Sequence, residues 1–376
     1  MRAPIGTALL CLSLALVACA DDEDSPTCSG VKLDRPVLVL ESDYQASGLG
    51  RIDEDGCFTE VADLALGTDP RLSDAHGRPF VSVRDQGVLH EIDRNELRIV
   101  NTVSAFADGE PQPNPWDVDV DTDGRLWVAR YDVSSVAVNG PDGSLESTVD
   151  LSKWADADGN PDMSAVRVVG DRVFVALEHL LNDENHVYAQ TGPGTVVVID
   201  VAPPHAVVSS FALPGRNPFS RLVPVPDEGE DAVLVALPGD NDQDDAGDGI
   251  AMTHLATGDG ALIASEVDLG GSALETVIAP RDGPGGGEVY AIVEGPVPGK
   301  NPTRVLAFDV ATGAVTRTFA GAPAFVHAGL AVVGGYLLVG DRTPGAATIH
   351  VFDRASGKEV GALAPRRLPP VSLLAL

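Results

Sequence analysis

A short valine-centred strand pattern recurs along the chain and constrains its fold more than any other feature. The seven copies are Val37–Leu40, Phe80–Val83, Leu126–Ala129, Val173–Leu177, Val233–Leu237, Val289–Val293 and Leu337–Val339. Their central residues lie 42 to 60 residues apart, and glycine, aspartate and proline bound each copy. This period, together with turn-forming residues at both ends of each copy, is typical of an array of four-stranded sheets.

Further strands accompany each copy. Val305–Phe319 reads as two strands joined by a turn built on Asp309, Thr312 and Gly313, and Ile349–Leu363 repeats this pattern. Another apolar run precedes most copies, for example Trp116–Val120. Four strands per repeat and seven repeats predict an all-β, seven-bladed β-propeller with four-stranded antiparallel blades. The alternative is two packed β-sandwiches, which would not need the same strand order seven times.

The first repeat has no innermost strand of its own. Val37–Leu40 follows a polar segment directly, whereas the chain ends in an apolar run, Val371–Leu376, with no hairpin after it. We therefore expect the C-terminal strand to pair in blade one and to close the ring, which would remove two exposed sheet edges.

The N-terminal segment is predicted to be a targeting element. Arg2 is followed by the apolar run Ile5–Val17, which is too short to span a bilayer. The motif Leu16–Cys19 resembles the lipobox of bacterial lipoproteins. This resemblance implies a signal peptide over 1–18, a Cys19 carrying diacylglycerol and palmitate, an acidic tether over 19–30 and a propeller domain over 31–376. Ala20 after the cysteine implies the outer membrane, facing the periplasm or the surface. The alternative is ordinary secretory cleavage that leaves a free cysteine.

Cys11 lies in the predicted signal peptide and Cys19 would carry the lipid, which leaves two cysteines, Cys28 and Cys57. In an oxidising compartment such a pair is expected to form a disulfide. The alternatives are two free thiols or half of a metal site.

The net charge of −31 indicates which partners the surface repels. An acidic surface repels nucleic acid and attracts cations, so no nucleic-acid partner is predicted. The alternative is an acidic, solvated surface without any specific partner.

Two sets of polar residues fall at equivalent positions of the repeats. One set begins the innermost strands: Asp117, Ser164, Ser220, Glu275, His327 and Ser372. The other follows the valine strands: Asp43, Asp85, Asp132, Glu178, Asp240, Glu294 and Asp341. Both sets would lie near the mouth of the central channel, where a divalent cation or a cationic ligand could bind. Alternatively, these carboxylates simply solvate the loops.

Calcium is the one cofactor that the sequence suggests. Two loops space oxygen-bearing side chains two residues apart, as hard-cation loops do. They contain Asp156, Asp158, Asn160 and Asp162 in the first, and Asp240, Asp242, Asp244 and Asp248 in the second. Neither completes an EF-hand. Motifs for zinc hydrolases, covalent haem and serine hydrolases do not occur in the sequence.

The turns Asp309–Gly313 and Asp353–Gly357, and the blade opening Asn114–Val128, resemble those of YVTN, lactonase-like and quinoprotein-like propellers. The resemblance covers residues 31–376 and implies architecture more than chemistry. It is compatible with a lipid-anchored module that binds or scaffolds an envelope protein or glycan. The alternative is a divalent-metal-dependent lactonase that resembles gluconolactonases. Its ligands would be Glu275, Asp117 and Asp341, with His327 as base, although that family also uses asparagine, which the innermost set lacks.

Overall fold

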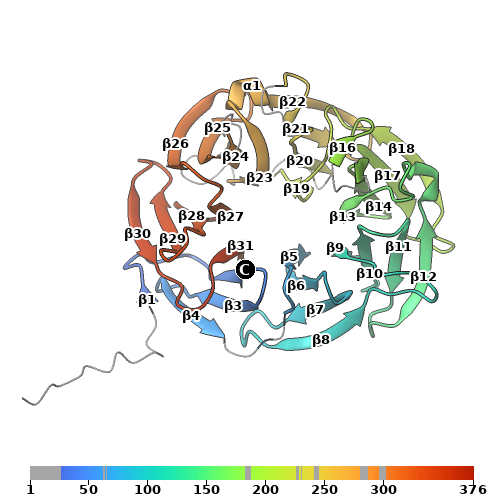
Figure 1. The fold of residues 1–376 in the computed structure, drawn as a ribbon, viewed down its shortest axis with the longest axis horizontal. Coiled ribbons are helices and arrows are strands. Elements are labelled where there is room, and N and C mark those ends of the chain that lie inside the picture. Colours follow the sequence, from blue (N-terminus) through green and yellow to red (C-terminus); the bar gives the residue numbers. More distant parts are fainter. Residues whose placement is uncertain are drawn as a thin grey trace, which may run out of the picture.

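The structure, a computed structural model, describes residues 27–61, 64, 66–182, 188–225, 228–229, 231–240, 245–279, 287–295 and 302–376. Seven antiparallel sheets stand in a ring, with one strand of each nearest the centre (Figure 1). The predicted all-β fold of seven four-stranded blades is therefore confirmed.

In blades two to seven, the strands follow one another in sequence from the innermost to the outermost. Blade two contains β5 (Pro70–Ala75), β6 (Arg78–Val83), β7 (Val88–Ile92) and β8 (Ile99–Ser104), and blade three β9 (Pro115–Val120), β10 (Leu126–Arg130), β11 (Ser135–Asn139) and β12 (Leu145–Asp150). Blade four contains β13 (Met163–Val169), β14 (Arg172–Leu177), β17 (Thr195–Asp200) and β18 (Val207–Ala212). Blade five contains β19 (Val223–Pro224), β20 (Ala232–Leu237), β21 (Gly249–His254) and β22 (Asp259–Ser265). Blade six contains β23 (Ser272–Ile278), β24 (Glu288–Glu294), β25 (Thr303–Asp309) and β26 (Val315–Ala322), and blade seven β27 (His327–Val333), β28 (Tyr336–Asp341), β29 (Thr348–Asp353) and β30 (Glu359–Leu363).

Blade one joins the two ends of the domain. Its strands β2 (Val37–Ser42), β3 (Ser47–Ile52) and β4 (Cys57–Val61) are completed on the inside by β31 (Pro370–Ala375). Val39 is opposite Leu373, and the Leu376 amide donates to the Pro36 carbonyl at 2.9 Å. The predicted ring closure by the C-terminal strand is therefore confirmed, as Figure 1 shows beside the C-terminus.

The core lies between the blades. Strands such as β20 bury every side chain, because both faces of a blade pack against neighbouring blades. Trp127 and Val136 of blade three, for example, share one apolar cluster with Val166 and Val175 of blade four. This two-sided burial explains why the second strand of each blade reads as an unbroken apolar run rather than as an alternating pattern.

Four local features differ from the sequence-based picture. A strand β1 (Thr27–Cys28) pairs with β4, although the sequence places the start of order near Val31. The strands β15 (Leu180–Asn182) and β16 (Tyr188–Gln190) form a hairpin after the second strand of blade four, where the sequence predicts a long loop. The innermost strand of blade five has only two residues. A single-turn helix, α1 (Glu266–Leu269), follows β22, capped by Ser265 and Asp268.

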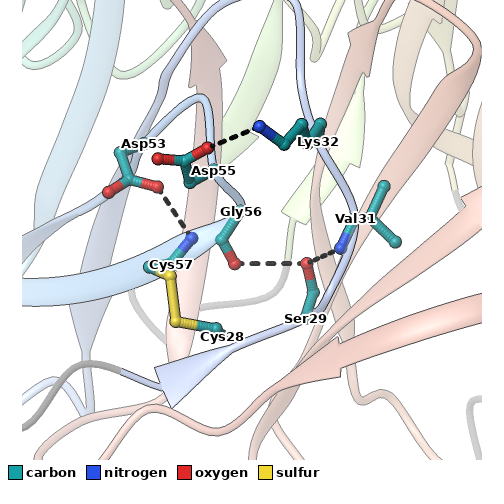
Figure 2. The surroundings of a disulfide bond; sticks show 8 residues. All are labelled: Cys28, Ser29, Val31, Lys32, Asp53, Asp55, Gly56 and Cys57. Carbon is teal, nitrogen blue, oxygen red and sulfur yellow. Dashed lines mark hydrogen bonds and ion pairs between the residues drawn. A yellow bond between two sulfur atoms is a disulfide. The ribbon is translucent and has the colours of Figure 1, made fainter.

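A disulfide explains the early start of order. Cys28 and Cys57 are opposite each other in the β1–β4 pairing and are bonded, as predicted (Figure 2). The Ser29 hydroxyl then donates to the Gly56 carbonyl at 3.1 Å, and the Asp53 carboxylate accepts from the Cys57 amide at 2.8 Å. The segment leading into the propeller is thereby fixed to the outer strand of blade one.

We expect removal of this bond to lower stability measurably. The disulfide spans 29 residues, and closing a loop of about 30 residues stabilises a protein by roughly 3 kcal/mol. Replacing both Cys28 and Cys57 by alanine should therefore lower the free energy of unfolding in guanidinium by about that amount. Dithiothreitol should destabilise the wild-type chain equally and leave the double variant unchanged. Equal stability of the two proteins would contradict this assignment.

Glu41 of β2 is a buried carboxyl at the ring closure. Only 2% of its surface is exposed, and its Oε1 has no hydrogen-bond partner among the described residues. Burial raises the pKa of Glu41 to about 9, and the negative charge of Glu60 adds to this effect. The folded state thus favours the protonated form far above the pKa of an exposed glutamate.

This shift predicts a pH dependence. Because the folded pKa lies above the unfolded one, the stability due to protonated Glu41 is complete below pH about 4.5 and is lost progressively toward pH 9. By pH 7 the loss amounts to roughly 3 kcal/mol. Glu41→Gln cannot ionise, so its melting temperature should exceed that of the wild type at pH 8 and match it at pH 5. A constant difference between the two proteins across this range would refute the assignment.

Candidate functional site

Five of the six residues predicted to begin the innermost strands lie within those strands, Ser220 precedes β19, and several of the six connect blades. Asp117 of β9 is 1% exposed. Its carboxylate accepts from the Ser73 hydroxyl of blade two at 2.6 Å and from the Val166 amide of blade four at 3.2 Å. The Arg221 Nε, next to β19 of blade five, lies 3.2 Å from the same carboxylate. Asp117 therefore links four blades around the axis.

Asp119, two residues after Asp117 on β9, makes similar contacts to neighbouring blades. Its carboxylate accepts from the Val168 amide at 2.7 Å, and His76 Nε2 lies 3.4 Å from it. The hydrogen bond with Asp119 raises the pKa of His76. Residues two apart on a strand point to the same side, so the two aspartates match the two β13 amides. They satisfy backbone groups that the inner edge of a sheet would otherwise leave unpaired.

Glu275 plays the same part between blades six and seven. Its two carboxylate oxygens accept from the Gly329 and Leu330 amides of β27 at 3.0 and 2.9 Å. Burial raises the pKa of Glu275 despite these hydrogen bonds. Gly329 adopts a φ of +82°, and a Cβ there would lie 3.0 Å from the backbone of Ser372 and Leu373, so the bulge requires glycine.

The other innermost residues have local partners. The Ser164 hydroxyl donates to the Pro218 carbonyl at 2.5 Å, and the Ser220 hydroxyl accepts from the Ala236 amide at 2.8 Å. His327 Nδ1 lies 2.9 Å from the Thr303 hydroxyl, and burial lowers the pKa of His327. Ser372 lies within the closing strand β31.

The residues predicted to follow the second strands lie at or just after the ends of those strands, and two of them bond within their own loops. Asp43 accepts from the Gln45 and Ala46 amides at 2.9 and 2.8 Å, and Asp341 accepts from the Thr343 amide and hydroxyl at 2.7 and 2.6 Å. The remaining contacts are those of Asp85 with Thr68, of Asp240 with Arg216 and of Glu178 with Tyr131, while burial raises the pKa of Asp132 and Glu294.

The first predicted calcium loop is closed by its own hydrogen bonds. Asp156 and Asp158 accept from backbone amides two residues ahead, those of Asp158 and Asn160, at 3.1 and 2.9 Å. Asp162 is buried and accepts from the Leu180 amide at 2.8 Å. Burial raises the pKa of Asp162 to about 8, and the negative charges of Asp158 and Glu178 contribute.

The second predicted calcium loop is organised by an arginine where it is described. Asp242 and Asp244 lie outside the described residues. Asp240 and Asp248 both contact Arg216, at 3.3 Å and 2.5 Å. Within the described ranges, no group of three or more His, Cys, Asp or Glu side chains has a metal-binding arrangement. Calcium binding therefore stays a prediction.

Arginines at the axis are the feature that the sequence-based reading missed. Arg71, Arg167 and Arg221 lie in or beside the innermost strands of blades two, four and five, and Arg84 follows the second strand of blade two. Arg71 Nη2 lies 3.4 Å from the Phe219 carbonyl of blade five, and Arg221 donates to the Asp74 carbonyl of blade two at 2.8 Å. Blades two and five lie on opposite sides of the ring (Figure 1). The two hydrogen bonds therefore connect blades that are not neighbours.

Trp116, Tyr131 and Glu178 border this arginine group. The Trp116 ring stacks on Tyr131 with centroids 4.5 Å apart, and the Arg84 guanidinium lies 3.7 Å from the Trp116 ring centroid. The Tyr131 hydroxyl donates to Glu178 at 2.8 Å. Burial raises the pKa of Glu178 to about 7, although the Tyr131 hydrogen bond, Arg71 and Arg84 oppose this effect.

Burial lowers the pKa of Arg71 to about 10, the negative charges of Asp117 and Glu178 oppose this effect, and the positive charges of Arg84 and Arg221 add to it. Burial also lowers the pKa of Arg84 and Arg167. The Nε of Arg167 and the Nε1 of Trp116 are buried donors without an acceptor among the described residues. The axis therefore holds a group of cationic and aromatic hydrogen-bond donors that internal contacts leave incompletely satisfied.

The comparisons with known proteins define the class of this protein, a seven-bladed β-propeller, and no narrower group. No family model matches the chain, and no curated protein matches it. Among solved structures, dihydro-heme d1 dehydrogenase NirN in complex with DHE is 18% identical, with a TM-score of 0.57 over 93% of this chain and 78% of that one.

Two further solved structures are similar over nearly the whole chain. A candidate 6-phosphogluconolactonase from Bacteroides fragilis is 14% identical, with a TM-score of 0.57 over 91% of this chain and 98% of that one. Apo AztD from Citrobacter koseri is 13% identical, with a TM-score of 0.54 over 92% and 98% of the two chains. At these identities the similarities establish the fold alone.

Proposed function

We propose that this chain is a lipid-anchored β-propeller of the cell envelope that binds a ligand at the axis of its ring. The observation that carries the binding role is the group of axial side chains from blades two to five, in which buried donors lack acceptors. Buried polar groups are normally paired, so unpaired ones at the centre of a rigid ring indicate a place that a ligand completes.

The geometry supports binding over metal-dependent lactone hydrolysis. Asp117, Glu275 and Asp341 lie on blades three, six and seven. Asp117 and Glu275 accept backbone amides of neighbouring blades, and Asp341 accepts from Thr343 of its own loop. These three carboxylates thus have separate partners, and the described residues include no group of three or more His, Cys, Asp or Glu side chains placed to hold a metal ion.

The anchoring role rests on the N-terminal sequence, which lies outside the described residues. The described part of the chain contains no helix of the length and hydrophobicity needed to cross a membrane. We propose that acylated Cys19 attaches the propeller to the outer membrane through the tether that precedes the Cys28–Cys57 disulfide. The partner would be an envelope protein, a glycan or a small solute.

Metabolic labelling with an alkyne fatty acid in a Gram-negative host tests the anchoring. The wild-type chain should incorporate the label and sediment with outer membranes, and Cys19→Ser should abolish both. Cys11→Ser is the matched control, because Cys11 lies inside the predicted signal peptide and should leave labelling intact. Labelling of Cys19→Ser at the wild-type level would overturn the proposed anchor.

Tryptophan fluorescence of the full chain tests the binding role. Panels of anionic, neutral and cationic envelope solutes should include at least one that changes the emission saturably. Trp116→Phe should remove most of that change, and Trp154→Phe should retain it. Equal loss in both variants would place the binding elsewhere.

A further inference from the structure

We propose that Arg71, together with the indole N–H of Trp116, forms a binding site for a small oxyanion, a carboxylate or a phosphate group. This inference rests on the proposed function and names the class of ligand that the axis would take. Nothing in the acidic composition predicts it, because the chain as a whole should repel anions.

The first observation is that Arg71 has no direct ion pair. Among the described residues, no carboxylate oxygen lies within 4.0 Å of its guanidinium, and the negative charges of Asp117 and Glu178 act on it only at longer range. Its hydrogen bond to the Phe219 carbonyl is 3.4 Å long, beyond the usual range for an N–H donor. Arg71 is half-buried, and a ligand that supplies the opposite charge would interact with it more strongly than with a fully exposed arginine.

The second observation is that two of the nearby carboxylates are already engaged. Asp117 interacts with Ser73, Val166 and Arg221. Glu275 uses both oxygens for β27 amides, whereas Glu178 accepts from Tyr131 through one oxygen and its Oε1 has no hydrogen-bond partner among the described residues. Turning Asp117 or Glu275 toward Arg71 would leave another buried group unpaired.

The third observation is the kind of hydrogen-bonding group that has no partner. Trp116 is 9% exposed, and its Nε1 has no acceptor among the described residues. An indole N–H and a guanidinium only donate hydrogen bonds. The Arg71 guanidinium lies 4.9 Å from the Trp116 ring centroid, so the two donors are neighbours. A complementary ligand must therefore bring acceptors, and a negative charge as well.

The aromatic surroundings hold these donors in place. Trp116 is fixed between the Tyr131 ring and the Arg84 guanidinium, and Arg84 is in turn bonded to Asp69 and Asn114 at 2.8 and 2.9 Å. Such support lowers the ordering cost of binding. A planar carboxylate or a phosphate matches the fork of a guanidinium, which is why we infer an oxyanion.

Titration of the full chain tests the site, with inorganic phosphate in one arm and citrate in the other, at constant ionic strength maintained with chloride. We expect a saturable rise in melting temperature with at least one of them, and the stronger arm identifies the oxyanion. Arg71→Met should weaken that affinity by about 10- to 100-fold, the usual effect of losing a hydrogen bond to a charged group. Arg98→Met is the matched control, because Arg98 is exposed and paired with Glu96.

Arg71→Met also separates a binding arginine from a structural one. If Arg71 is kept for a ligand, the variant without anion should melt at or above the wild-type temperature. The site would be overturned if Arg71→Met melts far below the wild type and the wild type shows no thermal shift with anion. Arg71 would then stabilise the fold by connecting blades two and five. Should that variant fail to fold, Trp116→Phe must lose the anion response while folding normally, and retention of the response would equally overturn the site.

The outcomes distinguish this inference from the proposed function. A saturable response to a neutral glycan, lost in Trp116→Phe but absent with phosphate and citrate, would overturn the oxyanion site and leave the axial binding role intact. No axial response to any solute class would overturn both.

Discussion

Deletion of Pro370–Leu376 is expected to abolish cooperative folding of the whole propeller. The deletion removes β31, which pairs with β2 along its length and packs Leu373 against blades one and seven. Val371 and Leu374 pack on the cluster shared with blade two. Three such side chains contribute roughly 5–8 kcal/mol, comparable with the total stability of about 5–15 kcal/mol typical of a folded protein. The measurement is circular dichroism melting of the soluble fraction.

Complementation in trans provides the control for this deletion. A synthetic peptide of residues 370–376 should restore melting of the truncated chain, because the vacated position in blade one accepts one antiparallel strand. A peptide with Leu373 replaced by aspartate should not restore it. A truncated chain that melts like the full-length protein would show that the ring does not depend on its last strand.

Asp117→Ala is expected to have the largest effect of any single substitution at the axis. The carboxylate connects blades two, three, four and five through Ser73, Val166 and Arg221. Its loss leaves the Arg221 Nε, the Ser73 hydroxyl and the Val166 amide without this acceptor. Removing one partner of a buried ion pair destabilises a protein by about 3–5 kcal/mol, and urea unfolding of the variant should show a loss of this size.

The matched comparison for Asp117 is Asp171→Ala. Asp171 also pairs with an arginine, Arg172 at 2.9 Å, but its side chain is 83% exposed. Exposed pairs contribute at most about 1 kcal/mol, so this variant should unfold like the wild type. Equal destabilisation by the two substitutions would indicate that the axial network contributes nothing specific.

The repeat pattern was sufficient to predict the architecture because each blade buries both faces of its second strand. That burial produces the seven valine runs, and the missing first strand of blade one indicated where Val371–Leu376 must pair. What the pattern could not predict were features with no periodic signal. The two-residue strand β1 depends on the disulfide, and the hairpin β15–β16 is an insertion within blade four.

The candidate site was predictable in position but not in contacts. Sequence alignment of the blades placed Asp117 and Glu275 correctly at the innermost strands, yet their partners are amides of the adjacent blade. Sheet register between neighbouring blades decides those contacts, and a single sequence does not reveal it. A signal for the arginines was present: Arg71 and Arg167 lie within the innermost strands of blades two and four, and Arg221 lies just before that of blade five.

The most direct test of axial binding is a nitrogen-15 spectrum of the indole N–H groups, recorded on the full chain with and without the preferred anion. Three tryptophans give three signals, and Trp116→Phe identifies the one that matters. The signal of Trp116 should move with saturation while those of Trp127 and Trp154 stay in place, because only Trp116 has a buried N–H that lacks an acceptor next to Arg71. A stationary Trp116 signal at an anion concentration that saturates the thermal shift would contradict binding at the axis.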